Sequence, residues 1–415
     1  MKFITKFYKH LANDSLYRNS IYLMLSTAVM AFFGFFFWII NTRLFTAEQI
    51  GLSTALISSI TLITGFSMVG MNQGIIRYLP KSNRKTDKIN TVITVVLLST
   101  LIASGIYILG LKSFSPKLSF LRENILFLVL FIAIAISSSF ESIYNNVFIA
   151  FRNTKYILYN NIFKSIIKLL LPAVLITLGS FAIFVSASLG TIFIVFVSIF
   201  ILHKLYSYKF RLTFKKDIFR NMYKLSFGNY IASLLAGLPL TLLPIMITNT
   251  LGPKQAAYFY MDMMIVNLLN TIQSSVNNSL FAEGSNNDKE LKKHIFKSIT
   301  FISLLLIPFM LVVVLFGGHI LLAFGKEYSN EGVVLLRLLA LSVIFTSING
   351  MLSSILNVKG KVNLILMMCI IGPSILLALI YFALPKGLVP LGYAWLIGEA
   401  IISLIYMTVV FLKAL

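Results

Sequence analysis

The stretch KLYSYKFRLTFKKDIFRNMY, residues 204–223, divides the sequence into two halves, because it is the longest polar connection in a chain of apolar segments. It follows the apolar run FAIFVSASLGTIFIVFVSIFILH at 181–203 and precedes a second apolar run at 224–248. Each run is long enough to cross a hydrocarbon core of roughly 30 Å at about 1.5 Å per helical residue. The stretch therefore predicts a surface linker between two groups of membrane-spanning helices.

Apolar runs of similar length recur on both sides of this linker. We predict spanning helices at 20–42, 50–76, 89–110, 124–150, 157–178, 181–203, 224–248, 256–281, 294–316, 329–357, 362–383 and 388–412. The composition agrees, with 58% hydrophobic and 12% charged residues, where a soluble domain carries about a quarter charged residues. The sequence predicts an all-α integral membrane protein of about twelve transmembrane helices, arranged as two pseudo-symmetric six-helix bundles.

The net charge of +22 is a topology signal. Of 35 Lys and Arg residues, 25 fall in segments on one side of the predicted membrane. Seven lie in loops on the other side (Arg43, Lys112, Lys117, Arg122, Lys254, Lys326, Lys386), and three lie well inside spans (Lys164, Lys168, Arg337). This asymmetry predicts a multi-pass protein of the cytoplasmic membrane with both termini in the cytoplasm. The basic segments would attract anionic membrane lipids, and they do not indicate nucleic acid.

Four regions follow from this pattern. Residues 1–19 read as a cytoplasmic, amphipathic and basic N-terminus, and 20–203 as the N-terminal six-helix bundle. Residues 204–223 form the basic cytoplasmic linker, and 224–415 form the C-terminal bundle. Asn19 and Asn41 flank the first span as Asn229 and Asn249 flank the seventh, at offsets of 210 and 208 residues. The spacing predicts a duplication with parallel halves.

Prolines are expected to bend several spans, because each removes an intrahelical hydrogen bond. Pro239 and Pro244 lie within one span, the first of the second half. We predict a bent helix there, beside a cavity.

Several motifs resemble those of a known family. The first half contains NTRLFTAEQIGLSTAL, followed by GFSMVGMNQGIIRYLPKSN, and the second contains LSFGNYIASLL and NTLGPKQAAYFYMD. These resemble the polysaccharide biosynthesis flippases for O-antigen, capsule or exopolysaccharide, within the superfamily of multidrug, oligosaccharidyl-lipid and polysaccharide exporters. The most specific piece is the IIRYLP end of the second span.

The resemblance implies a V of two bundles with alternating access and no ATP hydrolysis by the transporter. The implied substrate is an undecaprenyl-pyrophosphate oligosaccharide, and polysaccharide polymerase machinery is a candidate partner. The alternative is an ion-coupled multidrug antiporter of the same superfamily. Such antiporters tend to have acidic cavities, whereas bases within the spans suit a pyrophosphate. No enzyme activity is expected.

Ionisable groups inside spans are functional candidates, because burying a charge in a bilayer is costly. Lys164 and Lys168 lie four residues apart on one helix face. Lys168 would lie about 18 Å and Glu141 about 15 Å from the inner boundary, at about 1.5 Å per residue. This predicts a basic substrate site with Glu141 holding or releasing Lys168, or else a structural ion pair with Lys164 reaching inward.

Asp262 and Arg337 lie at similar predicted depth in the second half. They are expected to pair structurally, or Asp262 binds a coupling proton or sodium ion, and Glu399 is a further coupling candidate. Arg77, in the IIRYLP motif, is a candidate for the cavity mouth. Asn145 and Asn146 could bind sugar hydroxyls or join helices.

The sequence contains no motif that is typical of a cofactor site or a metal site. Cys369 is the single cysteine, and the four histidines (His10, His203, His294, His319) are scattered. We expect no cofactor, no metal and no catalytic residue.

Overall fold

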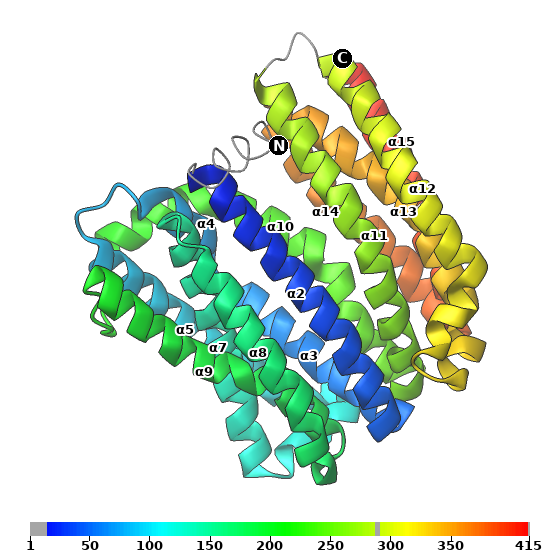
Figure 1. Ribbon diagram of the computed structural model, residues 1–415, viewed down its shortest axis with the longest axis horizontal. Helices are drawn as coiled ribbons and strands as arrows, with labels where there is room; N and C mark the ends of the chain where they lie inside the picture. Colours follow the sequence, from blue (N-terminus) through cyan, green and yellow to red (C-terminus); the bar gives the residue numbers. More distant parts are fainter. Residues whose placement is uncertain (1–14, 287–290, 414–415) are drawn as a thin grey trace, which may run out of the picture. The chain divides into compact units, whose positions relative to one another are not determined.

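The computed structural model describes residues 15–286 and 291–413, and every regular element within them is helical. Its long helices are α2 (Ser15–Leu44), α3 (Ala47–Ser67), α5 (Lys85–Leu109), α7 (Ile125–Ala150), α8 (Lys155–Val174), α9 (Ser180–Tyr206), α10 (Lys216–Thr250), α11 (Pro253–Asn286), α12 (Leu291–Leu322), α13 (Lys326–Val358), α14 (Val362–Ala383) and α15 (Leu388–Lys413) (Figure 1). The all-α prediction is confirmed. The predicted amphipathic N-terminus at 1–19 lies mostly outside the described residues.

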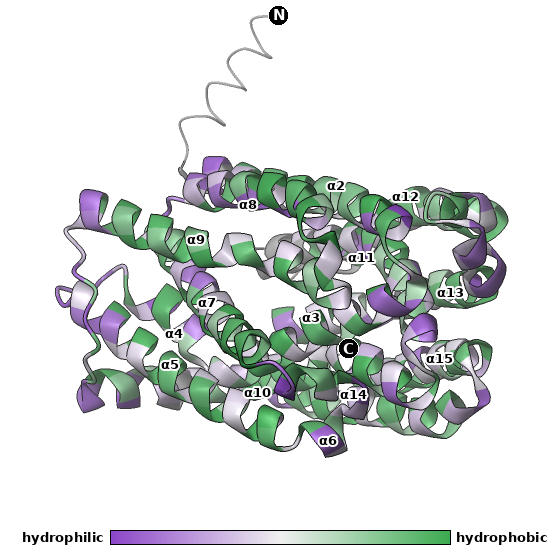
Figure 2. Ribbon diagram, turned by 90° about the horizontal axis from the view of Figure 1, so that it is seen from below, coloured by the Kyte–Doolittle hydropathy of each residue, from purple (hydrophilic) through white to green (hydrophobic). Residues whose placement is uncertain are grey.

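Eleven helices in the described part of the chain are long and apolar enough to cross a membrane. Hydrophobic residues run along the helices and hydrophilic ones gather at their ends and in the loops (Figure 2). The long helix that falls short of this composition is α11, because Asn267, Asn270, Thr271 and Gln273 interrupt its apolar sequence.

The chain forms two compact units. Unit 1 comprises residues 1–45 and 56–234, and unit 2 comprises 46–55 and 235–415. The division falls inside α3 and inside α10, so each of these helices contributes one part to each unit. The division that the sequence suggested at residue 224 also lies within α10.

The second predicted span, 50–76, is not one helix. It breaks after Ser67, where Val69 and Gly70 take φ of 47° and 78°, and α4 (Met71–Tyr78) follows. A Cβ on Gly70 would lie 3.3 Å from the carbonyl carbon of Ser226, about three turns into α10. The left-handed conformation favours glycine, and the missing side chain lets α4 pack directly on α10.

The predicted linker is held against unit 1. The side chain of Asn90 on α5 donates to the carbonyl of Lys209 and accepts a hydrogen bond from the hydroxyl of Tyr208. Tyr208 is only 2% exposed. The second part of the linker, 216–223, is helical and begins α10, so it is not a loop.

In unit 1, α8 packs against α2 and α9, and α4 and α5 pack against α7 (Figure 1). The core is built from side chains such as Met71, Val92, Ile143 and Met222. In unit 2, α13 is central and packs against α11, α12 and α15.

The start of α3 is held in unit 2 by a helix cap and by a close packing contact. Thr46 and Gln49 form a capping box, in which each side chain accepts a hydrogen bond from the backbone N–H of the other, at 3.3 and 3.1 Å. Two residues later, a Cβ on Gly51 would lie 1.6 Å from the carbonyl oxygen of Pro253 at the start of α11. The motifs AEQIG and LGPKQ of the two halves therefore meet in one unit.

Candidate functional site

The basic residues of α8 lie inside unit 1. The ammonium of Lys164 forms an ion pair with Glu141 of α7, with 2.5 Å between Nζ and Oε1. The side chains are only 15% and 11% exposed, so protein rather than solvent surrounds both charges. A buried pair of this kind depends on both partners, because either charge alone would be left uncompensated.

The partner of Glu141 differs from the one expected. The sequence suggested Lys168, but the Lys168 ammonium lies 4.3 Å from the ring centroid of Phe37 on α2. Lys164 and Lys168 share one side of α8, yet α8 packs against different helices along its length, and the deeper lysine turns toward α2. Lys168 thus makes a cation–π contact and, among the described residues, no ion pair with a carboxylate.

Gly190 of α9 fixes the position of Lys164. A Cβ at this glycine would lie 2.9 Å from Cγ and 3.3 Å from Cα of Lys164. The missing side chain therefore lets α9 press against the stem of the lysine and direct its ammonium toward α7.

Neighbouring asparagines that the sequence reasoning missed connect α8 to both of its neighbours. Asn160 donates to the Ser198 hydroxyl on α9 at 3.2 Å, and Asn161 donates to the Ser26 hydroxyl on α2 at 2.7 Å. Asn161 precedes Lys168 by two helical turns on the α2 side. The sequence signal for these contacts was that Asn160 and Asn161 lie in the same predicted span as Lys164 and Lys168.

Asn145 and Asn146 lie on α7, one turn or more beyond Glu141. Both are half-buried. Asn145 follows Glu141 by four residues, so it lies on the same side of the helix as the carboxylate.

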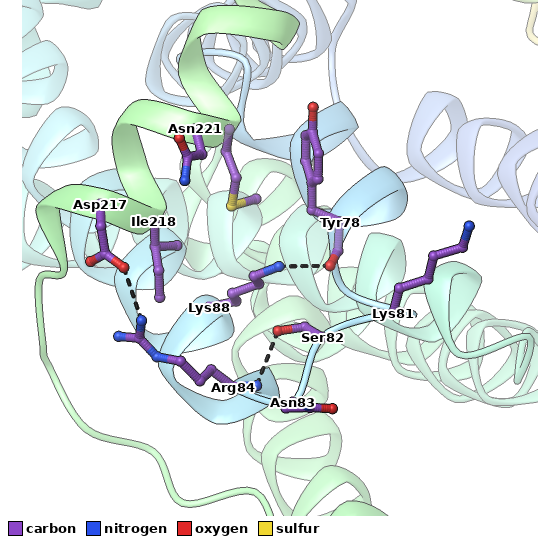
Figure 3. A pocket seen from close by; sticks show the side chains of 10 residues that line it. Tyr78, Lys81, Ser82, Asn83, Arg84, Lys88, Asp217, Ile218 and Asn221 are labelled. Carbon is purple, nitrogen blue, oxygen red and sulfur yellow. Dashed lines mark hydrogen bonds and ion pairs between the residues drawn. The ribbon is translucent and has the colours of Figure 1, made fainter.

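A basic pocket lies at the start of α5 (Figure 3). Its volume is about 640 Å³, and it is lined by Tyr78, Lys81, Ser82, Asn83, Arg84, Lys88, Asp217, Ile218, Asn221 and Met222. Lys88 donates to the carbonyl of Tyr78 at 2.8 Å. Arg77, predicted at a cavity mouth, lies in the last turn of α4, next to Tyr78 of this pocket, and is exposed. The run KSNRKTDK at 81–88 was the sequence signal for the pocket.

Arg84 is shared between two carboxylates in this region. Its Nη1 lies 2.9 Å from Asp217 of α10, and its Nε lies 3.2 Å from Asp87. The hydrogen bond from Arg84 lowers the pKa of Asp217, and the hydrogen bonds to Asp87 and Asp217 raise the pKa of Arg84. The arginine therefore ties the start of α10 to the start of α5.

Asp262 of α11 is buried in unit 2. It is 0% exposed, and neither carboxylate oxygen accepts a hydrogen bond from the residues that the structure describes. Gly332 of α13 covers it, since a Cβ there would lie 3.0 Å from Oδ1. An ionised carboxylate without a partner is costly in such a place.

The expected pairing of Asp262 with Arg337 is not formed. Arg337 is exposed, and its Nε donates to the carbonyl of Val314 on α12 at 2.9 Å. The reason is helical phase. Arg337 follows Gly332 by five residues, which places it about 140° round α13 from the face that meets α11.

Glu399 belongs to a small polar network between α13 and α15. Asn349 donates to Oε2 of Glu399 at 2.9 Å and accepts a hydrogen bond from the hydroxyl of Ser403 at 2.8 Å. Glu399 is half-buried and, unlike Asp262, has a hydrogen-bond donor.

The pattern of the polysaccharide biosynthesis protein family matches residues 16–282, well over half of the chain. The chain belongs to this family. The MatE family model matches residues 245–384 of the same chain, so the two matches together reach into both units. No curated protein sequence matches the chain.

Solved structures similar to this chain include transporters. An inward-facing multidrug resistance MATE family transporter of the MOP superfamily has a TM-score of 0.70 at 16% identity, over 95% of this chain and 98% of its own. A MATE protein in its straight conformation has a TM-score of 0.60 at 17% identity, over 97% of each chain.

A third similar structure is a MOP superfamily transporter from Pyrococcus furiosus. It was described with a binding pocket of reverse polarity that suggests a different function, and has a TM-score of 0.62 at 16% identity, over 97% of each chain. At these identities the likeness shows the fold alone, which is that of a multi-pass membrane transporter. Among the described residues of this chain, no three His, Cys, Asp or Glu side chains gather as metal ligands.

Proposed function

We propose that the protein is a flippase that carries an undecaprenyl-pyrophosphate oligosaccharide from the inner to the outer leaflet of the cytoplasmic membrane. The observation that supports this most is Lys168, a cation within a membrane-spanning helix that contacts an aromatic ring and no carboxylate among the described residues. A charge kept at such cost is explained when an anionic substrate compensates it.

The arrangement around α8 suits a pyrophosphate. Lys168 offers an ammonium that is already partly removed from water, while Lys164 is held by Glu141. A pyrophosphate near Lys168 competes with Glu141 for Lys164 and so gains a second cation. The prenyl tail never leaves the bilayer, so only the polar head needs a protein environment.

The basic pocket at the start of α5 supports an entry point for the head group. By the distribution of Lys and Arg it belongs to the cytoplasmic side, with both termini also there. Lys81 and Lys88 line it, and Arg77 lies just before it. The flipped product would pass to polysaccharide polymerase machinery outside, and no covalent chemistry by this chain is required.

A second candidate function is ion-coupled multidrug antiport. The MatE match at residues 245–384 favours it, together with Asp262, a buried carboxyl group that an organic cation or a coupling ion could compensate. We rank it second because the cationic residues of α8 would repel a cationic drug.

The test is replacement of Lys168 by Ala in cells that make the polysaccharide. We expect surface polysaccharide to fall at least tenfold at equal protein abundance, because the pyrophosphate loses its cation, and Lys168→Arg to retain most of it. Lys112→Ala, which changes an exposed lysine outside the predicted spans, is the matched control. Normal polysaccharide in Lys168→Ala, together with loss of drug resistance in Asp262→Asn, would overturn the flippase proposal in favour of the antiporter.

A further inference from the structure

Unit 2 contains a small polar pocket within the helix bundle, remote in sequence from the lysines of α8. Its volume is about 220 Å³, and α10, α11, α13 and α15 surround it. Its polar and aromatic lining consists of Asn270, Gln273, Ser274, Ser342, Thr346 and Trp395. The three residues from α11 belong to the polar stretch that sets this helix apart from the other long helices.

The pocket carries no charge among its lining residues, but it is rich in hydrogen-bonding groups. Gln273 donates to the carbonyl of Thr346 at 2.6 Å and accepts from the Thr346 hydroxyl at 3.1 Å, so its amide is fixed in one orientation. The side-chain oxygen of Asn270 is buried and accepts no hydrogen bond from the described residues. An acceptor left in this way is costly, and a ligand hydroxyl would remove the cost.

Trp395 adds a flat apolar surface to these groups. It is 7% exposed and lies on α15, where it lines the pocket together with the amides and hydroxyls of α11 and α13. A sugar ring has the complementary chemistry, because its C–H faces pack on an aromatic ring while its equatorial hydroxyls donate to and accept from amides.

We infer that this pocket is a subsite for one uncharged sugar ring of the transported oligosaccharide. The inference rests on the proposed function and adds the class of ligand that unit 2 would bind. The volume corresponds to about seven water molecules at roughly 30 Å³ each, which is enough for a monosaccharide.

The chain provides its own spectroscopic reporter for this subsite. It has two tryptophans, Trp38 in unit 1 and Trp395 in the pocket. Trp38→Phe leaves Trp395 as the one source of tryptophan fluorescence. The purified full-length variant is titrated in nanodiscs with lipid-linked oligosaccharide from the producing cells, with undecaprenyl pyrophosphate lacking sugar, and with the free oligosaccharide.

We expect a saturable change in Trp395 emission with both sugar-bearing probes and none with the sugar-free lipid. In the same background, Asn270→Ala should weaken binding of the sugar-bearing lipid roughly three- to tenfold, as expected for loss of one hydrogen bond. Binding of undecaprenyl pyrophosphate should be unchanged. Asn267→Ala is the matched control, because Asn267 is exposed one turn earlier on α11 and does not line the pocket. Ser342→Ala is a second pocket variant in case Asn270→Ala fails to fold.

Flipping of the lipid-linked oligosaccharide in proteoliposomes is measured in parallel and separates the two proposals. Flipping with an unresponsive Trp395 and unchanged affinity in both pocket variants would overturn the subsite and leave the flippase proposal intact. A saturable Trp395 response to free oligosaccharide without flipping would support the subsite and overturn the flippase. Absence of both flipping and response would overturn both.

Discussion

At the scale of single residues, the ion pair of Glu141 and Lys164 is the most exacting feature of unit 1. We expect Glu141→Gln to destabilise the protein by roughly 3–5 kcal/mol, because it leaves a buried ammonium without its partner. The measurement is thermal unfolding in detergent, followed by size-exclusion chromatography.

A double variant separates the pair from the individual residues. Glu141→Gln combined with Lys164→Met should recover most of the lost stability, since no charge is then left unpaired. If the two losses simply add, the ion pair makes no specific contribution. If Glu141→Gln lowers transport at unchanged stability, Glu141 has a coupling role instead of a structural one.

The contact between Arg84 and Asp217 predicts a dependence on pH. Because the pKa of Asp217 is lower in the folded protein than its ordinary value of 3.8, its contribution to stability is fully present above that value. It is lost as the pH falls through the folded pKa. The wild type should therefore unfold at a higher temperature than Asp217→Asn at pH 6, and the gap should close as the pH falls below about 4. A gap that is constant with pH would contradict the role of the ionised carboxylate.

The sequence could predict which charged residues share a depth, but not which of them touch. Glu141, Lys164 and Lys168 were placed together from helical rise alone. The choice of Lys164 as partner depends on Gly190, whose missing side chain seats the lysine, and on Phe37, which receives Lys168. Both lie on other helices, and no local pattern relates them to α8. The exposure of Arg337 could not be predicted either, because it depends on which face of α13 meets α11.

At the scale of helices, the contact of α3 with α11 is the tightest test of the packing. We expect Gly51→Ala to destabilise the protein by roughly 3 kcal/mol or more, since the new Cβ would meet the backbone of Pro253 at 1.6 Å and a helix must move. The check is the yield of folded protein and its unfolding temperature. Gly34→Ala in α2 is the control, because nothing lies within 4 Å of the added carbon. Equal behaviour of the two variants would show that the contact is easily relieved.

The twelve apolar runs predicted the long helices well because membrane spans are specified locally, by length and hydropathy. The break between α3 and α4 was missed because Gly70 alone is a weak signal. It becomes decisive only through Ser226, which lies far along the chain and meets Gly70 after folding. The polar side of α11 was visible in the sequence, but its significance depended on α13 and α15, which close the pocket around it.

At the scale of the whole molecule, we expect the proposed flippase to use a source of energy other than ATP, because its 415 residues contain no phosphate-binding loop motif. We expect reconstituted protein to flip lipid-linked oligosaccharide without ATP. The rate should respond to an imposed proton or sodium gradient through Asp262 or Glu399, or to an inside-negative potential. That potential favours outward movement of an anionic head by about 2.3 kcal/mol per charge per 100 mV.

The control is the same assay with Asp262→Asn, which should flip substrate without a response to the ion gradient if Asp262 is the coupling group. Flipping that needs ATP hydrolysis would refute the prediction and require a separate motor protein. Flipping that ignores every gradient would instead mean facilitated transport, driven by consumption of the product outside.

The residues 46–55 have a consequence for biosynthesis. They are made early, within the first helices, yet they belong to unit 2, and Gly51 packs against Pro253. During translation, the contact of Gly51 with Pro253 cannot form until about two hundred further residues have been synthesised and inserted. Unit 2 therefore cannot be completed from the C-terminal part of the chain alone. If the gene were divided at the 207–215 loop, the C-terminal fragment would lack residues 46–55 of unit 2. The two fragments would therefore have to associate in order to fold, and would not be independent folding units.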